Sequence, residues 1–153
     1  MNIQELRDID AKIVVVGLHP GIIQSILDYD FMNEHPTPSV IAIIANGKRY
    51  ARFFFGRKEI LLKVYSSLSL VSKETKKNVN MMINVTSGRR VLTSSIELLD
   101  YFPNIKLGTI FAEGVPEKHA IDLFEYANNK GVTLIGPASV GMVLPGSFKL
   151  GAI

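Results

Sequence analysis

The chain alternates between continuous apolar runs and segments whose apolar residues recur every three or four positions. Residues 12–18, 39–45 and 79–86 are rich in Val, Ile and Met, a pattern typical of strands buried on both faces of a sheet. Residues 21–31 and 90–102 have the spacing of amphipathic helices. Strands and helices are therefore expected to follow one another along the chain.

The second half of the chain continues this alternation. Residues 107–114 are expected to form a strand, and residues 116–130 a helix that ends at Gly131. A last strand is expected over residues 132–137. Residues 138–153 are interrupted by glycine and proline, which predicts a loop.

The pattern differs between the second and third apolar runs. Residues 49–56 alternate basic and aromatic side chains, which indicates an edge strand or a hairpin arm. Residues 59–67 are strand-like, and residues 67–78 are expected to be helical. The whole series predicts an α/β fold of the Rossmann-like class, with a mostly parallel sheet and helices on both of its faces.

Ligands of such sheets bind beyond the carboxyl ends of the strands, where the helices begin. The turn from Gly17 to Gly21 matches neither the G-x-G-x-x-G fingerprint nor a phosphate loop, so an ordinary tight turn is the alternative there. His19 lies in this turn and is in a position to touch a ligand, with an ordinary exposed histidine as the alternative. The residues expected at strand ends are Gly17, Asn46, Thr86, Glu113 and Pro137.

Cations follow the second strand. An NAD site requires an acidic residue there to hold the ribose 2′-hydroxyl, but the chain has Lys48 and Arg49, followed by Arg52, Arg57 and Lys58. This pattern disfavours NAD and favours a nucleotide with an additional ribose phosphate, such as NADP or coenzyme A. A solvated basic hairpin is the alternative.

The third strand leads into the segment NVTSGRR, Asn84 to Arg90, which contains small residues and two arginines. Small residues bring backbone N–H groups close to the start of a helix, and the arginines add positive charge beside them. This combination suits a phosphate or another oxygen-rich ligand.

Composition restricts the remaining possibilities. The 153 residues contain no cysteine, and the three histidines lack metal-ligand spacing, so no metal site is expected. A net charge of +3 does not by itself indicate nucleic acid. The first ten residues do not resemble a signal peptide, and no apolar run reaches the roughly 20 residues of a membrane span. A cytoplasmic protein is expected.

Several motifs resemble one enzyme family. They are AEGVP at 112–116, KGVTLIGPA at 130–138, PGSFKLG at 145–151 and INVTSGRR at 83–90. They are similar to the coenzyme A-binding domain shared by ATP-citrate lyase and the α-subunit of succinyl-CoA synthetase, and more closely to the lyase. The resemblance implies that residues 1–153 are one coenzyme A-binding domain, or a fragment, of a larger acyl-CoA synthetase.

The resemblance also implies roles for individual residues. Ser87 and Arg89 match positions that contact coenzyme A, and Ile110 and Phe111 fall in the strand beside the pantetheine path. Glu113 matches an acid near the reacting groups, where it can position or deprotonate the thiol. The alternative is that Glu113 only stabilises the start of the next helix. The expected coenzyme A-binding residues are Gly17, His19, Ser87, Arg89, Ile110, Phe111 and Pro137.

In such an enzyme the coenzyme A thiol attacks an acyl phosphate that forms elsewhere in the protein. The family's phosphorylated histidine lies in a further domain and matches none of His19, His35 and His119, so the chain is not expected to be catalytic alone. Its expected partners are coenzyme A and the phosphohistidine and ATP-grasp domains of the parent enzyme, without nucleic acid or a membrane. The alternative function is an NAD(P)(H)-binding redox-sensing or regulatory domain.

Overall fold

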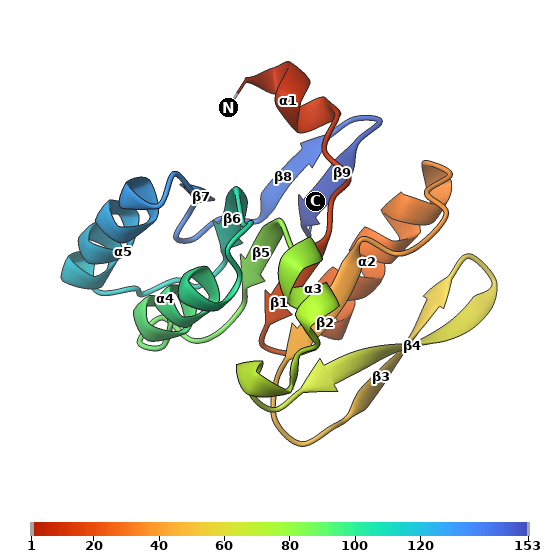
Figure 1. Ribbon diagram of the computed structural model, residues 1–153, viewed down its shortest axis with the longest axis horizontal. Coiled ribbons are helices and arrows are strands. Elements are labelled where there is room, and N and C mark those ends of the chain that lie inside the picture. Colours follow the sequence, from red (N-terminus) through yellow and green to blue (C-terminus); the bar gives the residue numbers. More distant parts are fainter. Residues whose placement is uncertain (1, 153) are drawn as a thin grey trace.

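The main sheet of the computed structural model, which describes residues 2–152, has seven strands in the order β3-β4-β2-β1-β5-β6-β7 (Figure 1). Six of them are parallel. Numbered along the chain, these six lie in the order 3-2-1-4-5-6, the doubly wound arrangement that reverses between β1 and β5. The Rossmann-like prediction is confirmed. The parallel strands are β1 (Ile13–Val16), β2 (Val40–Ile44), β4 (Lys58–Tyr65), β5 (Met81–Asn84), β6 (Leu107–Ile110) and β7 (Thr133–Ile135).

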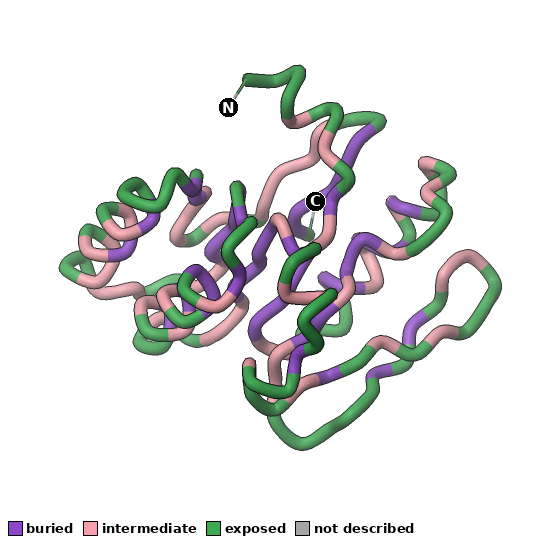
Figure 2. Tube along the Cα trace, in the orientation of Figure 1, coloured by how far each residue is buried: buried purple, intermediate pink, exposed green. Residues whose placement is uncertain are grey.

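Strand β3 (Tyr50–Phe55) is the antiparallel edge strand that the alternating pattern predicts. Ala51 and Phe53 are buried, whereas Tyr50 and Phe54 are about half exposed. The hairpin formed by β3 and β4 replaces a helix in the crossover from β2 to β4. About half of its residues are exposed, while the buried residues follow the central strands (Figure 2).

Both faces of the sheet are covered, which explains why the sequence of β1 is a continuous apolar run. Ile13 and Val15 join the core on the side of α2, whereas Val14 and Val16 join the core on the side of α4 and α5. The helices are α1 (Ile3–Arg7), α2 (Pro20–Met32), α3 (Lys73–Asn78), α4 (Val91–Tyr101) and α5 (Glu117–Asn129), with a 3-10 turn, η1 (Leu68–Leu70).

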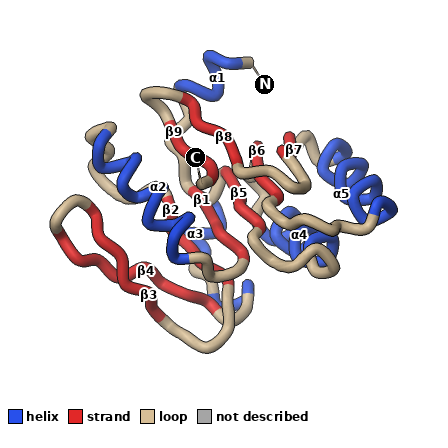
Figure 3. Tube along the Cα trace, turned by 180° about the vertical axis from the view of Figure 1, so that it is seen from behind, coloured by secondary structure: helices blue, strands red, loops and turns tan. Residues whose placement is uncertain are grey.

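The prediction of a loop over residues 138–153 is wrong, because residues 141–151 form a β-hairpin. Strands β8 (Gly141–Leu144) and β9 (Phe148–Gly151) pair with each other and lie beside α2 (Figure 3). Phe148 and Leu150 are fully buried against the sheet. Glycine marks close contact here: a Cβ on Gly141 would lie 2.2 Å from the Leu150 carbonyl oxygen.

Three other elements also differ from the predictions. The strand expected over 107–114 ends at Ile110, and the helix expected over 67–78 begins only at Lys73, after η1. Helix α1 was not predicted, although Asn2 and Glu5 form a reciprocal capping box at its start.

Candidate functional site

The loops after β1, β5, β6 and β7 meet at the carboxyl edge of the sheet. The last residues of three strands, Val16, Asn84 and Ile110, lie in register across β1, β5 and β6. The chain then continues into the loops that contain the predicted residues Gly17, Ser87, Arg89, Glu113 and Pro137. The structure therefore brings these five positions to one edge, as the topology predicted.

Glycines allow neighbouring loops at this edge to touch. A Cβ on Gly17, whose φ is +95°, would lie 2.7 Å from Val85 Cγ2. A Cβ on Gly88 would lie 2.7 Å from the carbonyl oxygens of both Glu113 and Gly114. The loop after β5 is therefore packed directly against the loops after β1 and β6.

Pro137 lies in the loop after β7, which is tied to the β6 loop. The Gly136–Pro137 peptide bond is cis. The Ala138 N–H donates to the Ala112 carbonyl at 2.9 Å. Pro137 is half-buried beside these contacts.

His19 is the N-cap of α2. Its Nδ1 accepts a hydrogen bond from the Ile22 N–H at 3.2 Å, so a neutral ring carries its proton on Nε2. The His19 side chain is exposed. It can therefore donate from Nε2 to a ligand while it caps the helix.

Helix α4 begins without a side-chain cap, and Arg90 is its N-cap residue. The first hydrogen bond of this helix runs from the Ser94 N–H to the Arg90 carbonyl. Within residues 2–152, the N–H groups of positions 91–93 therefore have no acceptor. Ser87 and Arg89 are exposed directly before this helix start. Unpaired N–H groups, the helix dipole and a guanidinium together favour an anion.

Asn84 is a residue of this edge that the sequence reasoning missed. It is fully buried, and its Oδ1 accepts from both the N–H and the hydroxyl of Thr86, at 2.9 and 2.7 Å. Its Nδ2 donates to the hydroxyls of Ser94 and Ser95, at 2.9 and 2.8 Å. The one sequence signal is an amide at the end of the apolar run Met81-Met82-Ile83.

Glu113 is exposed, three residues beyond the end of β6. Within the described chain, its carboxylate makes no hydrogen bond or ion pair, and α5 has no side-chain cap at its N-cap residue, Pro116. The geometry thus gives no support to the alternative that Glu113 caps this helix. Its carboxylate is available at the carboxyl edge.

Ile110 lies beneath the surface of the site, whereas Phe111 is only partly covered. The Ile110 side chain is fully buried in the core on the side of α4 and α5. Phe111 is half-buried and packs against the opposite core, on the side of α2. Both residues therefore support the edge from below.

The structure spreads the predicted basic residues along the β3–β4 hairpin, where Arg52 lies in the middle of β3, 3.7 Å from Glu59. Lys48 and Arg49 line a pocket of about 420 Å³ at the carboxyl ends of β2 and β4, together with Ser66. Arg57 and Lys58 lie at the turn of the β3–β4 hairpin, at the other end of the parallel strand β4. Only Lys48 and Arg49 are near the candidate site.

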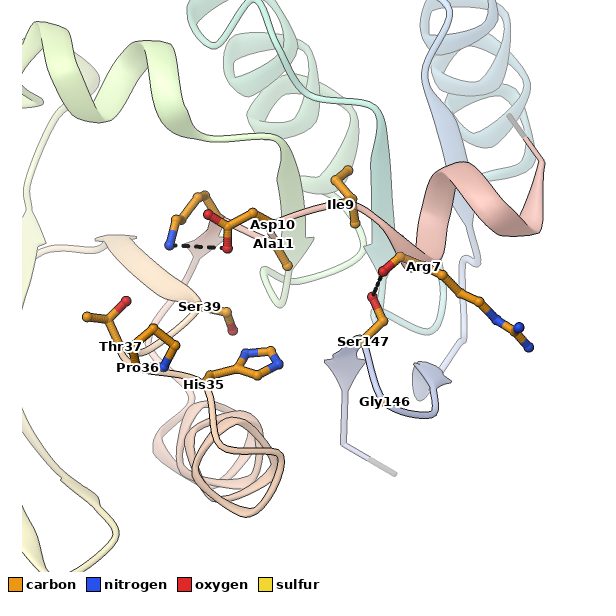
Figure 4. Close-up of a pocket in the computed structure, with 11 residues that line it drawn as sticks. Arg7, Ile9, Asp10, Ala11, His35, Pro36, Thr37, Ser39, Gly146 and Ser147 are labelled. Atoms are coloured by element: carbon orange, nitrogen blue, oxygen red, sulfur yellow. Dashed lines mark hydrogen bonds and ion pairs between the residues drawn. The ribbon is translucent and has the colours of Figure 1, made fainter.

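A second pocket, of about 400 Å³, lies at the amino ends of β1 and β2 (Figure 4). Its wall includes His35 and Ser39, which both contact the fully buried Asp30. The Ser39 N–H and hydroxyl donate to Asp30 Oδ2 at 2.7 Å, and His35 Nδ1 lies 3.4 Å from Oδ1. Burial raises the pKa of Asp30. This polar group is at the opposite edge from the candidate site.

Within residues 2–152, no group of three or more histidine or carboxylate side chains has an arrangement that could hold a metal ion. The helices of this part of the chain are all too short or too polar to cross a membrane.

Comparison with known proteins gives a consistent result. No family model matches the chain. The probable ATP-citrate synthase subunit 1 of Neurospora crassa is 43% identical over 144 residues, which are 92% of this chain and 21% of that protein. Human ATP-citrate synthase is 36% identical over 143 residues, 92% of this chain and 13% of that protein.

Solved structures agree with the sequence comparison. The ATP citrate lyase of Methanothrix soehngenii, in complex with citrate and coenzyme A, matches with a TM-score of 0.87 and 32% identity, over 95% of this chain and 24% of that one. A dinucleotide-forming acetyl-coenzyme A synthetase of Ca. Korarchaeum cryptofilum has a TM-score of 0.62 at 17% identity, which shows a shared fold. The chain spans less than a third of the length of each of these proteins.

Proposed function

The chain is homologous, over nearly its whole length, to one part of the ATP-citrate synthases, and from this relationship we propose that it is the coenzyme A-binding domain of such an enzyme. The observation that carries the proposal is its likeness to a lyase structure that contains citrate and coenzyme A. The anion-favouring start of α4 lies at the edge where doubly wound sheets bind nucleotides.

The residues of the carboxyl edge fit a ligand with several phosphates. In the proposed complex, Arg89, Ser87 and the N–H groups at the start of α4 bind one phosphate group. His19 donates from Nε2 to another oxygen. Lys48 and Arg49 supply positive charge beside their pocket, which suits the ribose phosphate.

Glu113 is proposed to act on the thiol. Its exposed carboxylate has no protein partner in the described chain, so it is available to accept the thiol proton. The sulfur then attacks the carbonyl carbon of an acyl phosphate, a C–S bond forms and inorganic phosphate leaves. We propose that the acyl phosphate comes from the remaining phosphohistidine and ATP-grasp domains of the parent enzyme, in the cytoplasm.

The proposal is tested by calorimetric titration of the purified chain with coenzyme A, NADH and NADPH. Coenzyme A is expected to bind more tightly than either nicotinamide nucleotide. Tighter binding of NADH or NADPH would instead favour a redox-sensing or regulatory domain on the same sheet. The absence of binding by all three ligands would refute both functions for the isolated chain.

A further inference from the structure

We infer that Asn84 is a positioning residue for the coenzyme A site, an inference that rests on the proposed function. Its side-chain amide has two acceptor sites and two donor protons, and all four are used. The residue is fully buried, so it cannot touch a ligand itself. Its effect on binding must pass through the groups that it holds.

The four hydrogen bonds fasten both ends of the loop that contains Ser87 and Arg89. On one side, Asn84 Oδ1 holds the backbone and hydroxyl of Thr86, which closes an Asx turn. On the other side, Asn84 Nδ2 donates to Ser94, whose hydroxyl donates in turn to the Arg90 carbonyl at 2.7 Å. One side chain thus fixes the loop on both sides of its exposed residues.

This arrangement matters because, within residues 2–152, the side chains of Ser87 and Arg89 make no hydrogen bond or ion pair of their own, so their positions depend on the backbone of the loop. Ser87 and Arg89 are exposed, and binding groups of this kind must be held within about 0.5 Å of their productive positions. Loss of the Asn84 amide would leave the fold of the sheet in place but allow the loop to move. The loss of coenzyme A affinity in an Asn84 variant should therefore exceed the loss expected from its decrease in folding stability alone.

Asn80, at the other end of the same strand, provides a matched control. Its Oδ1 accepts from the Lys12 N–H at 2.8 Å, and its Nδ2 donates to the Asp10 carbonyl at 2.9 Å. It has the same side chain and also ties β5 to a neighbouring loop, but at the edge away from the site. Replacing Asn80 therefore removes similar structural hydrogen bonds without affecting the position of the loop that contains Ser87 and Arg89.

The experiment compares Asn84→Ala and Asn80→Ala by coenzyme A calorimetry and urea unfolding. Asn84→Ala is expected to weaken coenzyme A binding by about tenfold or more, since several polar contacts are lost, while Asn80→Ala changes it by less than about twofold. In an Arg89→Ala background, Asn84→Ala should have a smaller effect, because part of its action passes through Arg89.

If Asn84→Ala does not fold, Ser95→Ala takes its place. Ser95 is fully buried and holds only one of the Asn84 protons, so a loss of about two- to fivefold is expected. Equal effects of the Asn84 and Asn80 variants, or an unchanged affinity in Ser95→Ala, would overturn the inference. If the unmodified chain does not bind coenzyme A, the proposed function itself fails, and the positioning role with it.

Discussion

Gly88 is where the loop after β5 touches the loop after β6, and Gly88→Ala tests whether that contact shapes the site. The new Cβ would lie 2.7 Å from two carbonyl oxygens, those of Glu113 and Gly114, about 0.7 Å inside the 3.4 Å of an ordinary contact. Both obstacles are backbone atoms, so one loop must move away from the other. Strain of this kind typically costs about 1–3 kcal/mol, or roughly 2–12 °C in Tm for a domain of this size.

The same displacement separates Arg89 from Glu113, so coenzyme A affinity should fall as well as stability. Gly114→Ala is the matched control, because its φ is +67° but a Cβ there would meet no atom within 4 Å. That variant should lose a comparable stability, about 1–2 kcal/mol, from backbone strain alone and keep its affinity. Calorimetry and thermal unfolding measure both quantities. Unchanged Tm and affinity in Gly88→Ala, or equal affinity losses in the two variants, would refute the reasoning.

Three further changes have distinct expected outcomes. Arg89→Ala should weaken coenzyme A binding by about ten- to a hundredfold. If Arg89 binds the 3′-phosphate, the loss should be smaller for dephospho-coenzyme A. Arg57 is a cation at the other edge of the sheet, so Arg57→Ala should leave the calorimetric affinities unchanged. Glu113→Gln should keep coenzyme A affinity but slow acyl transfer in the whole enzyme by about 10²–10⁴-fold, as measured by rapid quench. A transfer rate equal to that of the wild-type enzyme would rule out the catalytic role of Glu113. Burial raises the pKa of Asp30 above 3.8, so the folded state retains a proton that the unfolded state releases. Stability should therefore fall as the pH rises from 3.8 through the raised pKa. Urea unfolding at several pH values should show this fall for the unmodified chain but not for Asp30→Asn. Parallel stability profiles for the two proteins would contradict the prediction.

The central sheet was predictable because both of its faces are covered. Residues that alternate between two cores, such as Val14 and Val15, are all apolar and give a continuous run. The carboxyl edge was predictable too, since parallel strands send their following loops to one side. Glu113 was thus assigned to the carboxyl edge, although the strand before it ends four residues earlier than expected.

Other features depend on contacts between distant segments and left little trace in the sequence. The β8–β9 hairpin pairs Gly141 with Gly151, so residues that usually interrupt strands lie here in the strands themselves. The basic residues from Lys48 to Lys58 are close in sequence but are separated by the reversal of the β3–β4 hairpin. The partners of Asn84 on α4 are likewise set by how helix and strand pack.

The β8–β9 hairpin also has a consequence for how the chain folds during synthesis. It packs against α2 and makes contacts of very long sequence separation. The Tyr29 hydroxyl of α2 donates to the Leu144 carbonyl, 115 residues away, and the Ser147 hydroxyl donates to the Leu6 carbonyl of α1, 141 residues away. At about 5–20 residues per second, a ribosome needs roughly 6–28 s to cover these separations. During that time the core that contains Ile22 and Ile26 of α2 lacks Phe148 and Leu150 of the hairpin. The nascent chain is therefore exposed to aggregation or chaperone binding until residues 141–151 emerge from the exit tunnel.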